Sequence, residues 1–127
     1  MLIENSSNLI ASHQPLTLAN GIQVHEAELI NGNALVIGPD SLSLYRRPGD
    51  CLDALGKGFI RSAAFDAEFL LTDYPLLERH QAGFVQLSGG AGLLIGLNDA
   101  RLFRSANDAL RNHDEICRIS LAEDQSR

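Results

Sequence analysis

The sequence predicts an α+β fold that is predominantly antiparallel β and internally duplicated. Three observations predict it: an ungapped internal repeat, glycine-containing turns between short apolar segments, and alternation of apolar with polar residues. Residues 28–52 and 86–110, which are offset by 58, share nine identities in 25 positions. Random pairing at typical residue frequencies gives roughly two identities. We therefore expect two similar halves related by a pseudo-twofold axis.

The identities fall mainly on apolar residues and glycines. They are Leu29/Leu87, Gly32/Gly90, Leu35/Leu93, Ile37/Ile95, Gly38/Gly96, Leu44/Leu102, Arg46/Arg104, Asp50/Asp108 and Leu52/Leu110. Glycine adopts the positive φ that tight hairpin turns need. After the second turn, residues 42–45 alternate apolar with polar, as in a half-buried strand. Strands are expected over about 22–30, 34–38, 41–46, 58–65 and 115–121.

A short helix is expected after the third strand of each copy. Ser105 and Asp108 have the spacing of a capping box, which begins a helix over about 106–112. In the first copy, Pro48 suits the first position of a helix over about 48–55. Both helices have about two turns, so packing against a sheet must stabilise them.

The 127-residue chain is expected to form one domain. Its repeat units cover about 22–65 and 84–121, separated by an insertion of about 66–83. The insertion is expected to hold a strand over 68–72 and a helix over 74–82. Neither copy buries its apolar face alone. The sequence therefore predicts a barrel or a two-sheet sandwich with two or three short helices.

Charge and composition exclude several classes of protein. The net charge is −6 and Lys57 is the single lysine, so a surface for nucleic acid or for an anionic membrane is not expected. The sequence has no apolar run of about 18 residues and no basic, apolar leader at its start. Its two cysteines, Cys51 and Cys117, suit free thiols in the reducing cytoplasm.

The candidate binding residues are the equivalent pair Arg46 and Arg104, together with the aromatic residues before them, Tyr45 and Phe103. Two arginines across a twofold axis suit a carboxylate or a phosphate, which guanidinium groups bind bidentately. The alternative is structural. Each arginine pairs with the aspartate four residues later and so ties its strand to its helix.

The sequence gives no pattern for a catalytic centre, a metal or a cofactor. None of the four histidines is spaced with another ligand as in a zinc site. The glycine-rich segment 88–92 precedes a strand and not a helix, so we interpret it as a hairpin. Cys51 lies near a helix start, which can activate a thiol, but has no nearby histidine.

Two functions remain open. The first is a non-catalytic, β-rich module that binds another protein or itself as a homodimer. Its contact candidates are the strand 22–30, which mixes polar and apolar residues on both faces like an edge strand, and exposed Tyr45 and Phe103. The alternative is a small-molecule binding protein or small enzyme that takes an anionic ligand between the repeats, beside Arg46 and Arg104.

Overall fold

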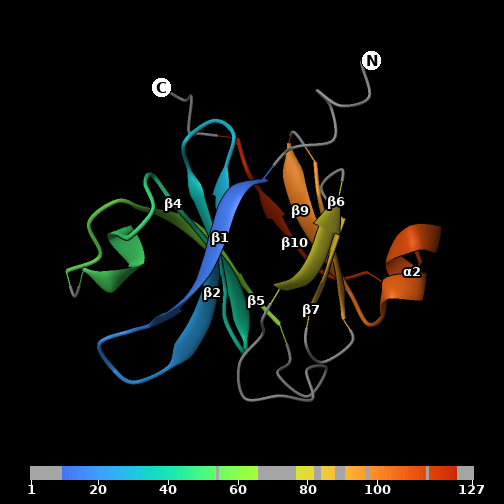
Figure 1. Ribbon diagram of the computed structural model, residues 1–127, viewed down its shortest axis with the longest axis horizontal. Helices are drawn as coiled ribbons and strands as arrows, with labels where there is room; N and C mark the ends of the chain where they lie inside the picture. Colours follow the sequence, from blue (N-terminus) through green and yellow to red (C-terminus); the bar gives the residue numbers. More distant parts are fainter. Residues whose placement is uncertain are drawn as a thin grey trace.

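The computed structural model describes residues 10–53, 55–65, 77–81, 84–87, 91–96, 98–113 and 115–122, with 77–81 and 84–87 described by their backbone. The described strands form two antiparallel five-stranded sheets (Figure 1). Sheet A contains, in spatial order, β1 (Ile10–Thr17), β2 (Gln23–Leu29), β3 (Ala34–Ile37), β4 (Ser41–Tyr45) and β5 (Phe59–Ala64). Sheet B contains β10 (Glu115–Ser120), β9 (Asp99–Phe103), β8 (Gly92–Ile95), β7 (Phe84–Leu87) and β6 (Leu77–Gln81).

The two sheets pack face to face around one apolar core. Alternation along β4 turns Leu42 and Leu44 inward, and both side chains are fully buried. The first half contributes Ile10, Ala27, Leu29, Leu35, Ile37, Leu42 and Leu44; the second contributes Ala91, Leu93, Ile95, Ala100, Leu102, Cys117, Ile119 and Leu121. Of the two predicted architectures, the molecule therefore has the two-sheet arrangement.

The sheets meet along β5 and β10 without closing into a barrel. Arg61 Nη1 donates hydrogen bonds to the backbone oxygens of Ser120, at 2.9 Å, and Ala122, at 2.7 Å. The contact is made by side chains, whereas a closed barrel needs a backbone ladder between its first and last strands. The predicted closed barrel is therefore wrong.

Both sheets have the same strand order and pairing register. The bounds of β8 and β9 each lie 58 residues after those of β3 and β4. The β3–β4 and β8–β9 ladders then match pair for pair. Between the fourth and fifth strands each sheet also has a bulge, which leaves Ile60 unpaired in sheet A and Ile116 in sheet B.

The correspondence extends to β1 and β6, which lie outside the repeat units expected over 22–65 and 84–121. His13 pairs with Ala27, and His80 pairs with Val85, 58 residues after Ala27. The two strands read IASHQ and LERHQ in this register. Residues 77–81 are therefore a strand, and the predicted helix over 74–82 is wrong there because pairing with β7 outweighs local helix signals. The strand expected over 68–72 lies outside the described residues.

One of the two repeat helices is confirmed and the other is reduced to a single turn. In α2 (Ala106–Arg111), the Ser105 Oγ accepts the Asp108 N–H at 3.1 Å, as the capping box predicts. The equivalent segment forms only the 3₁₀ turn η1 (Asp50–Leu52). Gly49 precedes it with a φ of 89°, a left-handed conformation that interrupts the helix expected over 48–55.

The predicted strands over 22–30, 34–38, 41–46, 58–65 and 115–121 are confirmed as β2, β3, β4, β5 and β10. The interpretation of 22–30 as an edge strand is wrong, because β2 lies between β1 and β3. Its mixed pattern arises because polar side chains on both of its faces, His25 and Glu26, are buried.

Candidate functional site

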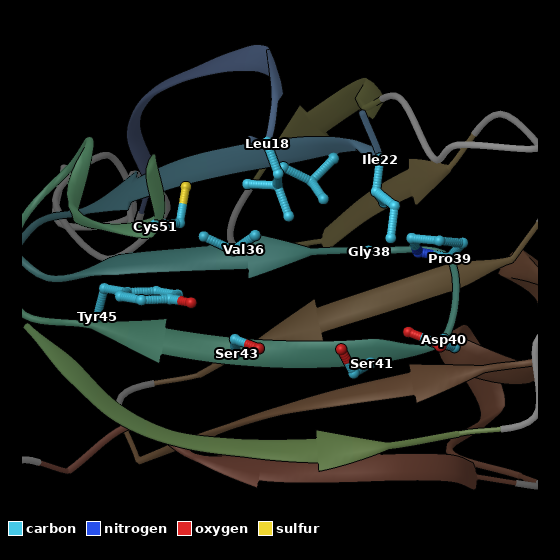
Figure 2. Close-up of a pocket in the computed structure, with 11 residues that line it drawn as sticks. Leu18, Ile22, Val36, Gly38, Pro39, Asp40, Ser41, Ser43, Tyr45 and Cys51 are labelled. Atoms are coloured by element: carbon cyan, nitrogen blue, oxygen red, sulfur yellow. The ribbon is translucent and has the colours of Figure 1, made fainter. Parts of the chain in front are cut away.

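The outer face of sheet A carries a groove of about 100 Å³, which we call the sheet A groove (Figure 2). Val36 and Ser43, cross-strand neighbours on β3 and β4, lie along its floor. They face outward because the alternate residues of both strands fill the core. Figure 2 shows Leu18 and Ile22, from the loop between β1 and β2, above this floor.

Leu18 and Ile22 form one wall of the groove, and hydrogen bonds within their own loop hold them in place. The Leu18 N–H donates to the Ile22 oxygen at 2.8 Å. Asn20 Oδ1 accepts the Ile22 N–H at 3.0 Å. Gly21, with a φ of 90°, provides the left-handed residue that this tight connection needs. The far end of the groove is the turn from β3 to β4, which contributes Asp40.

A buried carboxylate fixes the near end of the groove. The Glu26 side chain is 2% exposed. Its Oε2 accepts the Gly49 N–H at 2.8 Å, and its Oε1 accepts from Gln14 Nε2 at 3.2 Å. This links β2 to the turn before η1. Cys51, on η1, reaches the groove with its Sγ 4.0 Å from Glu26 Oε2.

The Cys51 thiol is not activated in this setting. Burial, and then the negative charge of Glu26, raise the pKa of Cys51 to about 11. The thiol is therefore protonated at neutral pH, whereas a nucleophilic cysteine needs the thiolate. A helix start can lower the pKa of a thiol, but η1 is only one turn long and carboxylates lie beside Cys51.

Tyr45 borders the groove on β4. Its ring packs edge-on against Phe59, with centroids 5.7 Å apart. Burial raises the pKa of Tyr45, and Cys51 raises it further, so the hydroxyl stays protonated at neutral pH. The hydroxyl points along the strand toward Ser43 (Figure 2).

The equivalent face of sheet B is covered by α2 (Figure 1). The helix approaches so closely that a Cβ at Gly92 would lie 2.8 Å from Ala109 Cβ and 2.9 Å from Ala106 Cα. Ala109 is 1% exposed as a result. The glycine at position 92 therefore allows the helix to seat on the sheet.

A second polar cluster lies on the inner side of β1 and β2. His13 Nδ1 and His25 Nε2 are 2.9 Å apart. Burial, and then the charge of His13, lower the pKa of His25 to about 4, so its ring is neutral at physiological pH. The described residues contain no group of three or more histidine, cysteine or carboxylate side chains placed to hold a metal.

The four candidate residues from the sequence divide between the two sheets. Tyr45 borders the sheet A groove, whereas Phe103 lies on the outer face of sheet B and is fully buried. The core separates these two side chains, so they do not meet. The expectation that Phe103 is exposed is wrong, because α2 and a neighbouring arginine cover it.

Arg46 and Arg104 are exposed residues directly after β4 and β9. Their pairing with Asp50 and Asp108 stays a prediction, and these two aspartates also contact other groups. Asp50 Oδ2 accepts the Arg47 N–H at 3.2 Å, and Asp108 Oδ1 lies 4.0 Å from His113 Nδ1.

Sequence reasoning missed Glu26, Val36 and Ser43 as members of a site. A signal for Glu26 was present, because it breaks the apolar pattern of a strand that has both faces buried. Val36 and Ser43 carried no signal of their own. Only the comparison of Ser43 with its repeat equivalent, Arg101, would have indicated a local difference between the halves.

Comparison with protein-family models, curated proteins and solved structures gives no match for this chain. Within the described residues, neither helix has the length and apolar character that spanning a bilayer requires.

Proposed function

We propose that this chain is a non-catalytic binding module whose sheet A groove holds a side chain of a partner protein. One observation carries the proposal. The groove lies open on the outer face of sheet A, whereas α2 covers the equivalent face of sheet B. Its volume of about 100 Å³ is well below the roughly 300–1,000 Å³ of most small-molecule sites. The size therefore favours one protein side chain over a metabolite.

The pKa values of Cys51 in the groove and of His25 on the inner side of sheet A support a role without catalysis. The pKa of Cys51, about 11, opposes nucleophilic attack at neutral pH. The pKa of His25, about 4, is far below the value near 7 that suits a general base. Cys51 and Cys117 are both free thiols, which fits the reducing cytoplasm that we propose as the location.

A random-peptide display library tests the proposed function. Peptides selected on the protein should lose binding to Ser43→Arg, which places a long side chain on the groove floor. They should keep binding to Ser62→Arg, because Ser62 pairs with Ser43 on the same sheet face but does not line the groove. Selection that yields no binding peptide, or peptides that bind Ser43→Arg as well as wild type, would contradict the proposal.

The anionic-ligand alternative predicts different results. A thermal-shift screen with carboxylates and phosphates would give stabilisation that is lost in Arg46→Ala and Arg104→Ala, with Ser43→Arg having no effect. The homodimer expected from the sequence is checked by the mass of the wild-type protein in solution.

We also infer that the two sheets arose by duplication of one five-stranded unit. The matched registers, the matched bulges and the nine identities support this origin. The unit would then begin at β1 in the first half and at β6 in the second, so it is longer than the repeat over 22–65 and 84–121. An experimental structure with another strand order or register in either sheet would contradict the inference.

A further inference from the structure

In sheet B, the position that corresponds to the sheet A groove is filled by a guanidinium. Arg101 occupies the register position of Ser43, 58 residues later. Its Cζ lies 5.8 Å from the centroid of the Phe103 ring. Its Nη1 donates a hydrogen bond to Asn112 Oδ1 at 2.7 Å, and its Nε is 3.8 Å from Asp99 Oδ1. The second half thus holds an arginine side chain with an aromatic ring, an amide and a carboxylate.

Sheet A keeps the aromatic ring but has no arginine on the strand. Tyr45 takes the position of Phe103, and the short side chain of Ser43 replaces Arg101. The space that this leaves is the groove beside Tyr45 (Figure 2). A volume of about 100 Å³ accommodates several water-sized groups, which suits the end of one long side chain.

The charges around the groove favour a cation. Asp40 lines one end, and Glu26 lies behind Cys51 at the other. None of the described residues that line the groove is a lysine or an arginine. The whole chain has a net charge of −6, which steers a cationic partner toward it.

We infer that the sheet A groove binds the guanidinium of an arginine side chain on a partner protein. This inference rests on the proposed function, because it names the side chain that the groove holds. A planar guanidinium stacks on the Tyr45 ring and presents donors to the hydroxyl of Ser43, two residues away on β4, while the Asp40 carboxylate at the far end of the groove adds negative potential. A lysine ammonium is compact and strongly hydrated, so it matches the ring and these acceptors less well.

Four blocked amino acids test the inference: the N-acetyl, N-methylamide forms of arginine, lysine, citrulline and norleucine. Citrulline has nearly the shape of arginine without its charge, and norleucine tests a purely apolar occupant. Each is titrated into the ¹⁵N-labelled full chain while the backbone amides of Val36, Ser43 and Tyr45 are followed by NMR. The arginine probe should shift these amides and bind roughly 3- to 30-fold tighter than citrulline, the range of cation–π energies.

Four variants locate the effect. Ser43→Arg should lose the response, because its own guanidinium fills the groove as Arg101 fills sheet B. Ser62→Arg adds the same charge outside the groove, so this variant should keep most of the response to the arginine probe. Tyr45→Leu should weaken arginine binding while Tyr45→Phe retains it, which separates loss of the ring from loss of the hydroxyl.

The outcomes separate this inference from the proposed function. If norleucine, or display-selected peptides without arginine, occupy the groove and arginine has no advantage over citrulline, the arginine inference is overturned and the binding module stands. If no probe shifts the groove amides and no selected peptide is sensitive to Ser43→Arg, both are overturned.

Discussion

The outer faces of sheets A and B differ although their strands pair alike. In sheet B, Ser105 caps a helix that lies over Gly92, and Arg101 covers Phe103. In sheet A, left-handed Gly49 reduces the equivalent helix to one turn, and the groove stays open. A shared strand framework thus allows the connection after the fourth strand to determine what each face exposes.

The largest expected effect concerns the common core, where the two halves are alike. Leu35 and Leu93 are equivalent and fully buried in the common core. Leu35→Ala and Leu93→Ala should each lower the free energy of unfolding by about 3–4 kcal/mol, the usual cost of removing a buried leucine side chain. Urea denaturation followed by circular dichroism measures both. A difference of more than about 2 kcal/mol between them would show that the two inner faces are not equivalent.

The next largest effect is the pH dependence of stability that the buried histidine of sheet A should cause. The pKa of His25 is about 4 in the folded protein and near 6.5 when unfolded. Below pH 6.5 the unfolded chain therefore binds a proton that the native protein does not. Stability should fall between pH 6.5 and 4 by up to about 3 kcal/mol and level off below. His25→Leu should remove this slope, whereas His113→Ala, at an exposed helix end, should keep it. Equal slopes in wild type and His25→Leu would refute the assignment.

Replacing Gly92 tests how closely α2 packs. In Gly92→Ala the new methyl group would meet Ala109 and the backbone of α2 below 3 Å, so the helix must move. We expect a loss of about 2 kcal/mol. Gly96→Ala is the matched control on the same hairpin, because its nearest contact would be 3.6 Å, and it should change stability by less than about 0.5 kcal/mol. Thermal unfolding of both variants gives the comparison, and equal midpoints would contradict the close contact.

The smallest effect concerns the carboxylate behind the groove. Glu26→Gln keeps an acceptor for the Gly49 N–H but removes the charge, so we expect a loss of about 1–2 kcal/mol. The pKa of Cys51 should also fall from about 11, because Glu26 helps to raise it. The rate of Cys51 alkylation against pH, followed by mass spectrometry, measures this change. Glu28→Gln, on the same face of β2, is the control that should leave the rate profile unchanged.

Much of the framework was predictable because it depends on local chemistry. The alternation in 42–45 and the glycine turns defined β3 and β4, and the Ser105 capping box defined α2. These features involve residues within a few positions of each other. The repeat then indicated that two such units share a core, although periodicity alone did not distinguish a barrel from two sheets.

The remaining features depend on contacts between distant residues. Segment 77–81 becomes a strand by pairing with β7, although its own residues show no alternation of apolar with polar side chains. The helix over 48–55 was overpredicted because Pro48 is a good first residue, but Gly49 bonds to Glu26, 23 residues earlier. The groove requires the loop after β1 to lie over β3, which no short pattern encodes.

Each sheet is a meander in which every strand pairs with its neighbour in the chain. Contacts within a sheet are therefore local, and such contacts form quickly. During synthesis, β1 to β5 can complete all their ladders before β6 is made. Their apolar inner face nevertheless stays uncovered until sheet B follows. We expect fragments 1–65 and 66–127 to be unstable alone and to recover the native circular dichroism spectrum when mixed, so each sheet becomes stable only when it associates with the other.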